Sequence, residues 1–136
     1  MSVELTSPTG LMQPVPYHHV AVATGTRQVY ISGQTARAAD GAPAAPGDLA
    51  GQVAAVLRNV HIALASAGAG FTDVVRLTFY VTDWRPEKIE AFMGGVESVA
   101  QELGLPIPLP PSSLIGVDFL FEPDVLVEVE ATAVLD

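Results

Sequence analysis

The sequence contains no cysteine among its 136 residues. Disulfide bonds, thiolate nucleophiles and cysteine-ligated zinc or iron–sulfur sites are therefore excluded. The length is that of one ordinary domain, and 49% of the residues are hydrophobic. A domain of this size buries about 68% of the surface that its unfolded chain exposes, so it needs no covalent staple to fold. We expect residues 1–136 to form a single domain.

Positive charge is scarce as well. Six Lys and Arg residues face 15 Asp and Glu residues, which gives a formal net charge of −9. Proteins that bind nucleic acid neutralise phosphates with clustered cations, whereas these six are scattered. An anionic membrane surface would repel the same charge, and no apolar run reaches the roughly 20 residues of a membrane span. We therefore expect no nucleic-acid and no membrane partner. The first ten residues also lack the basic start and apolar core of a signal peptide, which predicts a cytoplasmic protein.

Several familiar catalytic signatures are missing. The sequence has no GxGxxG, GxxxxGK[ST], HExxH or GxSxG pattern. His18 and His19 are adjacent, so on a strand they would point to opposite sides and could not easily share one metal. This geometry disfavours a metal site at the histidines. His18 remains a candidate for contact with a substrate, and the alternative is a structural or surface role.

The patterns that are present predict the element order β-β-α-β-α-β-β after a mostly irregular lead-in over residues 1–16. Prolines mark the lead-in, a turn at Gly25 predicts a β-hairpin, and Asp48 has the position of a helix N-cap. Apolar spacing then separates helices from strands. The expected strands are 19–23, 28–32, 74–82, 113–118 and 126–134, and the expected helices run from 49 to 67 and from Asp83 or Trp84 to Leu103.

Two helices can cover one face of a four- or five-stranded sheet, which predicts an α+β fold. The other face would then lack a cover, because the chain has no third layer. The residues that could face it are Tyr30, Arg76, Thr78, Tyr80, Glu128, Glu130 and Thr132. We expect other copies of the protein to provide that cover.

Two of these residues carry carboxylates on one strand face. Glu128 and Glu130 lie two residues apart, about 6.6–7 Å along a strand. A carboxylate on a face that becomes covered must find a partner or keep its proton, so either residue could act as a general base. The alternative is a solvated face, or pairing with a cation such as Arg76.

The order and spacing of several motifs resemble the RidA/YjgF family, also labelled enamine/imine deaminase and, in older usage, L-PSP endoribonuclease. The resemblance covers about residues 14–134. It is carried by Tyr17, VYISGQ at residues 29–34, Gln52 and Asn59 in the first expected helix, DVVRLTFYVTD at residues 73–83 and VEVEA at residues 127–131. Each motif alone is a weak signal, and their joint occurrence is a strong one.

The resemblance implies a chorismate-mutase-like α+β fold, with two helices on one face of a mixed sheet. It also implies a homotrimer with a barrel core, in which the clefts lie between subunits. The implied activity is hydrolysis of reactive 2-imino or 2-enamino acids to 2-keto acids and ammonia, with no metal or organic cofactor. The ligand would be a small metabolite.

Site residues follow from the same resemblance, position by position. Glu128 would position or activate the attacking water and Tyr17 would hydrogen-bond the substrate. Ser32 and Gly33 would supply backbone contacts, while Ser112 and Ser113 line the cleft. The family's motif before this strand is Pro-x-Arg-Ser/Thr, and Ser112 occupies the position of its substrate-binding Arg.

This departure predicts an unusual substrate. A serine hydroxyl cannot reproduce the two parallel hydrogen bonds that a guanidinium makes to a carboxylate. Either the substrate lacks a carboxylate there, or another cation substitutes, for which Arg85 or a histidine from the neighbouring subunit is the candidate. His18 and Trp84 are further candidate contacts with the substrate. The leading hypothesis is an imine or enamine deaminase with an atypical substrate. The alternative is a non-catalytic, small-molecule-binding trimer with a regulatory role. RNA cleavage, which the older family label suggests, is opposed by the net charge of −9.

Overall fold

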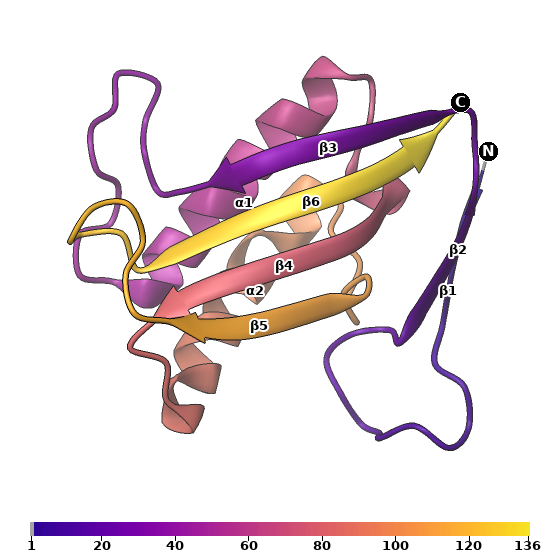
Figure 1. Cartoon of the computed structure of the whole chain (residues 1–136), viewed down its shortest axis with the longest axis horizontal. Helices are drawn as coiled ribbons and strands as arrows, with labels where there is room; N and C mark the ends of the chain where they lie inside the picture. Colours follow the sequence, from indigo (N-terminus) through magenta and orange to yellow (C-terminus); the bar gives the residue numbers. More distant parts are fainter. Residues whose placement is uncertain (1) are drawn as a thin grey trace.

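Two helices lie on one face of a four-stranded mixed sheet in the computed structural model, which describes residues 2–136 (Figure 1). The strands and helices follow in the order β1 (Ser2–Thr6), β2 (Val20–Thr24), β3 (Arg27–Gln34), α1 (Leu49–Ser66), β4 (Val74–Thr82), α2 (Ile89–Leu103), β5 (Ser112–Val117) and β6 (Val127–Leu135). The expected α+β class is confirmed.

The main sheet has the strand order β3-β6-β4-β5. β6 pairs antiparallel with both β3 and β4, and β4 pairs parallel with β5. The parallel pair requires a crossover, which α2 provides between β4 and β5. β3 and β5 are consequently the two outer strands, and they lie on opposite edges of the sheet (Figure 1).

The first helix begins and ends where the sequence predicts. The Asp48 side chain accepts a hydrogen bond from the backbone N–H of Gly51, which caps α1, and Gly68 adopts a positive φ just beyond the helix end. Its buried residues are Gln52, Val53, Ala54, Val56, Leu57, Val60 and Leu64. By length and composition α1 is apolar enough to cross a membrane. Its buried side chains instead belong to the core shared with the sheet and α2, as expected for the core helix of a folded domain.

The helices approach each other closely at Gly95 of α2. A Cβ at this position would lie 2.5 Å from the Ala50 carbonyl oxygen and 2.8 Å from the Cβ of Val53. The absence of a side chain therefore lets the two helix backbones come together. α2 itself starts later than predicted, at Ile89. Arg85 is extended, because a residue before a proline is disfavoured in helical conformation, so no helix can run through it from residue 83 or 84. A 3₁₀ turn at Pro86–Lys88 then precedes α2.

The N-terminal region contains one strand that the sequence did not predict and lacks the hairpin that it did. The lead-in over residues 1–16 is not wholly irregular, since β1 pairs antiparallel with β2 along five residue pairs. Residues 19–23 and 28–32 also do not form a hairpin, because β2 belongs to this separate two-stranded sheet while β3 joins β6. Gly25 lies against the backbone of Leu135, where a Cβ would come within 2.8 Å of the carbonyl oxygen. The chain therefore enters the main sheet just after Gly25, and β2, which precedes it, lies at an angle to β3 (Figure 1).

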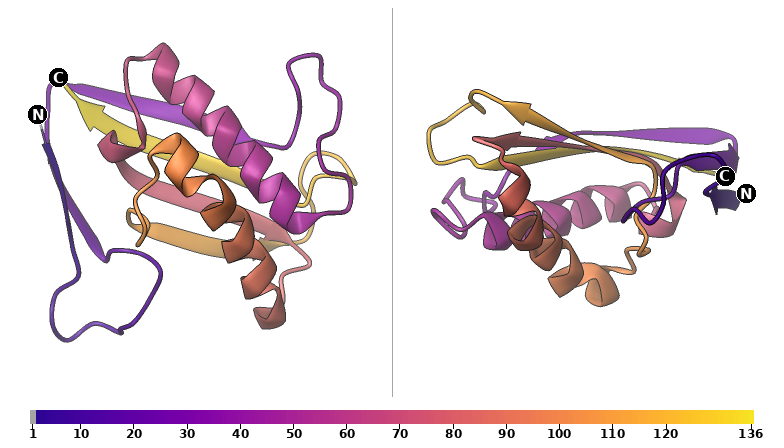
Figure 2. Two further views of the ribbon diagram at one scale, coloured as in Figure 1. Left: turned by 180° about the vertical axis from the view of Figure 1, so that it is seen from behind. Right: turned by 90° about the horizontal axis from the view of Figure 1, so that it is seen from below.

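The second face of the main sheet is not covered by any other element of residues 2–136 (Figure 2). Both helices lie on one side of the strands, and the loop between β5 and β6 curls over the other side. Exposure varies across this open face. Tyr30 is 72% exposed, whereas Thr78 is only 8% exposed between its neighbours. The prediction of an uncovered face is confirmed for a single chain.

Candidate functional site

The contact between Gly33 and Glu128 is the most confined feature near the predicted site residues. Ile31 pairs with Ala131 and Gln34 pairs with Val129, so Ser32 and Gly33 together oppose a single residue of β6. This extra residue is a β-bulge, a feature that re-aims the backbone locally. A Cβ on Gly33 would overlap the carboxylate of Glu128. The bulge therefore brings the backbone at residue 33 directly against that carboxylate.

The two carboxylates of β6 have different surroundings. Glu128 is half-buried, and its carboxylate accepts no hydrogen bond from residues 2–136. Glu130 is exposed and accepts a hydrogen bond from the Tyr80 hydroxyl at 2.8 Å. This hydrogen bond is the main cause that raises the pKa of Tyr80 above its usual range. Arg76, considered above as a partner for either Glu, donates to the Ser113 hydroxyl at 2.6 Å instead.

Tyr17 is held in place by the backbone on both sides. Leu109 N–H donates to the Pro16 carbonyl at 2.8 Å, and His18 N–H donates to the Leu109 carbonyl at 2.7 Å. Together these bonds form a short parallel bridge between Tyr17 and Leu109. The ring of Tyr17 also contacts the His19 ring edge to face, with centroids 5.3 Å apart. The proline-rich segment before β5 therefore fixes Tyr17 beside the start of that strand.

Tyr17 and Ser112 line one cavity of about 250 Å³, which we call the apolar pocket. It lies between the N-terminal segment, the N-terminal half of α2 and the start of β5. Its lining consists of Met12, Val15, Pro16, Tyr17, Phe79, Ile89, Phe92, Met93, Leu109, Ser112, Ser113 and Leu114. None of these side chains is charged.

The two serines at the start of β5 have different partners. The Ser112 hydroxyl donates to the Pro110 carbonyl at 2.7 Å, and Ser112 pairs with Leu77 of β4. Ser113 pairs with the next residue, Thr78, and its hydroxyl accepts the hydrogen bond from Arg76. Because successive strand residues point to opposite faces, Ser112 shares the helix-covered face with Leu77, and Ser113 shares the open face with Thr78 and Arg76.

The remaining predicted residues lie outside the lining of the apolar pocket. Trp84 packs edge to face on Phe92, which does line it, with ring centroids 6.1 Å apart. The Arg85 side chain is 62% exposed, with its closest carboxylate, Asp83, at 3.5 Å. His18 is partly buried, and its Nδ1 is buried with no hydrogen-bond partner in the described chain. No cation among residues 2–136 therefore lines the pocket.

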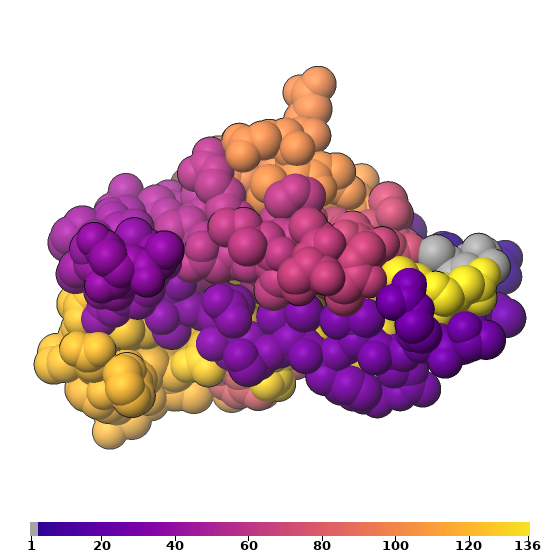
Figure 3. Space-filling view, turned by 90° about the horizontal axis from the view of Figure 1, so that it is seen from above, coloured from indigo at the N-terminus to yellow at the C-terminus, as the bar shows by residue number. Residues whose placement is uncertain are grey.

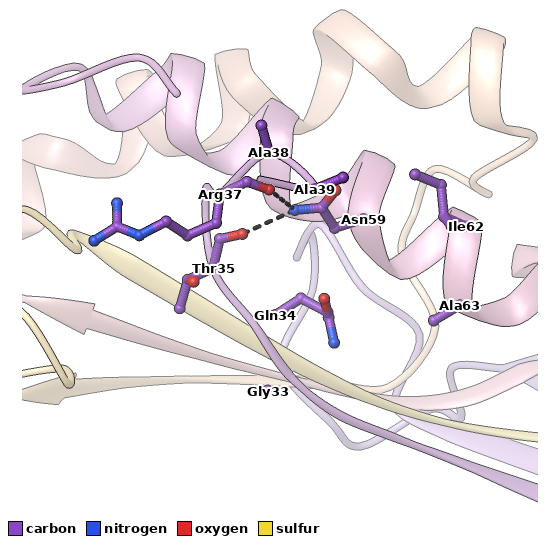
Figure 4. Close-up of a pocket in the computed structure, with 9 residues that line it drawn as sticks. All are labelled: Gly33, Gln34, Thr35, Arg37, Ala38, Ala39, Asn59, Ile62 and Ala63. Atoms are coloured by element: carbon purple, nitrogen blue, oxygen red, sulfur yellow. Dashed lines mark hydrogen bonds between the residues drawn. The ribbon is translucent and has the colours of Figure 1, made fainter. Parts of the chain in front are cut away.

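Sequence reasoning did not anticipate a second cavity, of about 400 Å³, beside the Gly33 bulge. We call it the Asn59 pocket (Figure 4). The Asn59 amide donates to the carbonyl groups of Thr35 at 2.9 Å and Arg37 at 3.0 Å. The lining is completed by Gly33, Gln34, Ala38, Ala39, Ile62 and Ala63. The sequence predicts a loop over residues 36–47, and Asn59 is the sequence signal for the attachment of this loop to α1.

The Asn59 pocket lies at an exposed edge. β3 and the 36–47 loop, both purple, run along the surface beside α1 in Figure 3. The Arg37 guanidinium points away from the cavity (Figure 4). It pairs with Asp124, with an Nη2–Oδ1 distance of 2.8 Å, and with Glu122 at 3.4 Å. These interactions attach the 36–47 loop to the segment that precedes β6.

The predicted site residues thus fall into two groups. Gly33 and Glu128 lie at the β3 edge, while Tyr17 and Ser112 lie at the β5 edge. Three strand spacings separate β3 from β5, which is roughly 14 Å. Within one chain these groups do not meet. Among residues 2–136 there is also no cluster of three His, Asp or Glu side chains that could hold a metal ion.

The chain is similar to known proteins along nearly its whole length. The sequence profile of the family described as Endoribonuclease L-PSP matches residues 11–135. No curated protein matches the sequence. Among solved structures, the Rid family protein YyfB from Yersinia pestis, a protein of unknown function, is 34% identical, with a TM-score of 0.87, and the match covers 99% of this chain and 100% of that one.

Two structures from E. coli are more distant. The YjgF gene product is 27% identical with a TM-score of 0.68, and the match covers 96% of this chain and 92% of that one. TdcF, whose structure contains bound serine, is 26% identical with a TM-score of 0.69, over 100% of this chain and 99% of that one.

Proposed function

Because the chain belongs to the endoribonuclease L-PSP family, which includes the Rid and YjgF proteins, we propose that it hydrolyses the C=N bond of a small imine or enamine. The products are a carbonyl compound and ammonia. The observation that carries the proposal is the Glu128 carboxylate, which is half-buried, unbonded and adjacent to the Gly33 backbone. A carboxylate in this situation can accept a proton from water.

The reaction proceeds by addition and elimination. Water donates a proton to Glu128 while its oxygen bonds to the imine carbon, and the C=N electron pair moves to nitrogen, which takes up that proton from Glu128. Glu128 then accepts the hydroxyl proton of the resulting carbinolamine and passes it to the amine. The C–N bond breaks, ammonia leaves and the carbonyl group forms. An enamine enters the same sequence after protonation at carbon converts it to the imine. Tyr17 provides a hydroxyl that can donate to the substrate.

The catalytic unit in this proposal is a homotrimer with clefts between subunits. It is supported by the uncovered sheet face and by the separation of Tyr17 from Glu128 on opposite sheet edges. A cyclic assembly that sets the β5 edge of one chain beside the β3 edge of the next would unite the two groups. Light scattering should give three times the mass of one 14.2 kDa chain. A stable monomer would contradict the assembly.

Activity is tested on imines generated in situ by an amine or amino-acid oxidase, with ammonia release as the readout. Glu128→Gln should lower the rate by about 10²–10⁴-fold, because it removes the proton acceptor but keeps the size of the side chain. Glu97→Gln, a change on the exposed surface of α2, is the matched control and should leave the rate unchanged. If the parent protein does not exceed the spontaneous rate with any imine, the proposed activity is wrong.

A second candidate function is small-molecule binding without chemistry, in a regulatory role. The observation that favours it is Ser112, which stands where the family motif carries Arg, and the bound serine in TdcF shows that a family structure can hold a small ligand. A ligand at 100 times its dissociation constant stabilises the folded state by about 2.7 kcal/mol. A thermal-shift screen of small metabolites that finds a stabilising ligand, without turnover of any imine, would favour this alternative. A cytoplasmic location stays a prediction.

A further inference from the structure

The apolar pocket has room for one ring and offers few polar groups. Its volume is about 250 Å³. For comparison, an apolar cavity of about 150 Å³ accepts benzene. The rings of Phe79 and Phe92 meet edge to face in its wall, with centroids 4.9 Å apart, and Leu114 and Met93 complete the apolar surface around them. Tyr17 and Ser112 contribute side-chain hydroxyls, whereas the Ser113 hydroxyl bonds Arg76 on the open face of the sheet.

The Ser112 hydroxyl already gives its proton to the Pro110 carbonyl. Its oxygen therefore faces an approaching ligand as an acceptor. The Tyr17 hydroxyl makes no hydrogen bond to other residues in the 2–136 range, so it is available as a donor or an acceptor. One donor and one acceptor suit a neutral imine or amide, which carries an N–H and a lone pair. A carboxylate can only accept hydrogen bonds, so against the Ser112 oxygen two acceptors would face each other without a proton between them.

Among residues 2–136, no other charged side chain replaces the missing cation. Arg76 reaches Ser113 from the open face of the sheet, and Ser112 shares the opposite face with Leu77. Arg85 lies in solvent. The net charge of −9 adds a repulsive field for any anion that approaches. A carboxylate that enters an apolar cavity without a partner loses its hydration without recovering the interaction energy.

From these observations we infer that the apolar pocket selects neutral imines that carry one aliphatic or aromatic group, and rejects their carboxylated counterparts. The inference rests on the proposed function for the reaction, but the pocket's preference for neutral ligands is independent of catalysis. The apolar group packs against Phe92 and Leu114, and the C=N unit lies at the hydroxyls of Tyr17 and Ser112. The Glu128 carboxylate of the neighbouring copy completes the site.

The kinetic test uses two imines that differ only in the carboxylate. Oxidation of phenylalanine gives the carboxylated imine, and oxidation of 2-phenylethylamine gives the neutral one. The neutral imine should have a kcat/KM at least about tenfold higher. The carboxylate finds no charged partner in the pocket, and a hydrogen bond to a charged group contributes about tenfold or more where it exists. A preference for the carboxylated imine, with ammonia release intact, would overturn the inference and leave the proposed function standing.

Two variants test whether residue 112 sets the preference between the neutral and the carboxylated imine. Ser112→Arg introduces a guanidinium at the pocket and should reverse the preference between the two imines. Ser66→Arg adds the same charge at the exposed end of α1 and should leave the preference unchanged. If Ser112→Arg folds like the parent by circular dichroism but does not change the ratio of kcat/KM for the two imines, the pocket does not set the preference and the inference is overturned. An Arg76→Gln variant that abolishes turnover of a carboxylated imine would likewise overturn the inference.

A binding measurement decides the matter without catalysis. The single tryptophan, Trp84, contacts Phe92 in the pocket wall, so its fluorescence should report occupancy. Phenylacetamide should change the emission of the parent protein at lower concentration than phenylacetate, by about tenfold or more. Ser112→Arg should invert that order. If no imine is hydrolysed but the amide still binds preferentially, the deaminase proposal fails and the pocket assignment survives. Equal binding of both probes would overturn the assignment.

Discussion

Gly33 lies so close to the carboxylate of Glu128 that residue 33 has no room for a Cβ. The contact depends on the bulge in β3, which places Ser32 and Gly33 opposite one residue of β6. The backbone of one strand thus limits the positions that the acidic side chain of the other can take. A general base must be held within a fraction of an ångström of its water, so this restriction is functionally useful.

Gly33→Ala should therefore reduce turnover while leaving the fold intact. The added methyl meets the Glu128 side chain from its Cγ to its carboxylate. That side chain is flexible and can rotate away, so we expect little change in the thermal midpoint. Rotation moves the carboxylate by about 1 Å or more, and such misplacement can cost about 10²-fold in rate. Activity on a neutral imine and thermal unfolding of the same preparation check both parts.

Gly70→Ala is the control for this substitution. Nothing lies within 4 Å of a Cβ built at residue 70, and the backbone there is extended. This variant should keep the parental rate. If Gly33→Ala also keeps the parental rate, the position of Glu128 does not govern catalysis.

Neighbouring glycines in α2 should respond to alanine in opposite directions. Gly94 is exposed and a Cβ there meets nothing within 4 Å, so Gly94→Ala should stabilise the fold by about 0.5–1 kcal/mol through helix propensity. Gly95→Ala drives a methyl into the backbone of α1 at Ala50 and should cost about 1–3 kcal/mol. Urea unfolding of the two variants measures the change in the free energy of unfolding, which should be positive for Gly94→Ala and negative for Gly95→Ala. Equal effects would contradict the observed closeness of α1 and α2.

Local sequence patterns were sufficient to predict the strands and helices that bury one face. The alternation of apolar residues predicted β4 with the bounds that the structure has, Val74–Thr82. Asp48 and Gly68 similarly marked the ends of α1, because a cap and a positive φ are properties of a few adjacent residues.

Contacts between distant parts of the chain were not predictable in the same way. β1 was missed because its pairing with β2 depends on an edge that forms only after folding. Tyr30 opposes Thr132, about one hundred residues later, and the bulge between Ile31 and Gln34 exists only in that pairing. Glu128 could therefore be named from the sequence, but its contact with Gly33 could not. The apolar pocket likewise depends on the bridge between Tyr17 and Leu109.

Gln52 of α1 connects the helix to the segment before β6, and its removal should destabilise the protein. It is 2% exposed, donates to the Asp124 carbonyl at 3.0 Å and accepts from the Leu126 N–H at 3.0 Å. Gln52→Leu fills the same space but leaves both backbone groups unpaired, at about 1–3 kcal/mol each. We expect a loss of at least about 2 kcal/mol in urea unfolding. Gln101→Leu, on the exposed side of α2, should change stability by less than about 0.5 kcal/mol. Equal losses would show that the Gln52 bonds contribute little.

The ion pair between Arg37 and Asp124 should make stability fall at acidic pH. Hydrogen bonding to Arg37 lowers the pKa of Asp124 below its ordinary 3.8, so the pair contributes fully above that value and its contribution is lost as pH falls through the folded-state pKa. Asp124→Asn should be less stable than the parent at pH 7 and should lose less stability between pH 5 and pH 2. Arg58 lowers the pKa of Glu102 in the same direction, so the acid dependence is reduced rather than abolished.

Thermal midpoints across this range, for the parent, Asp124→Asn and Arg37→Gln, provide the measurement. Both variants should flatten the curve, and an unchanged slope in Asp124→Asn would show that the pair is too solvated to couple folding to protonation.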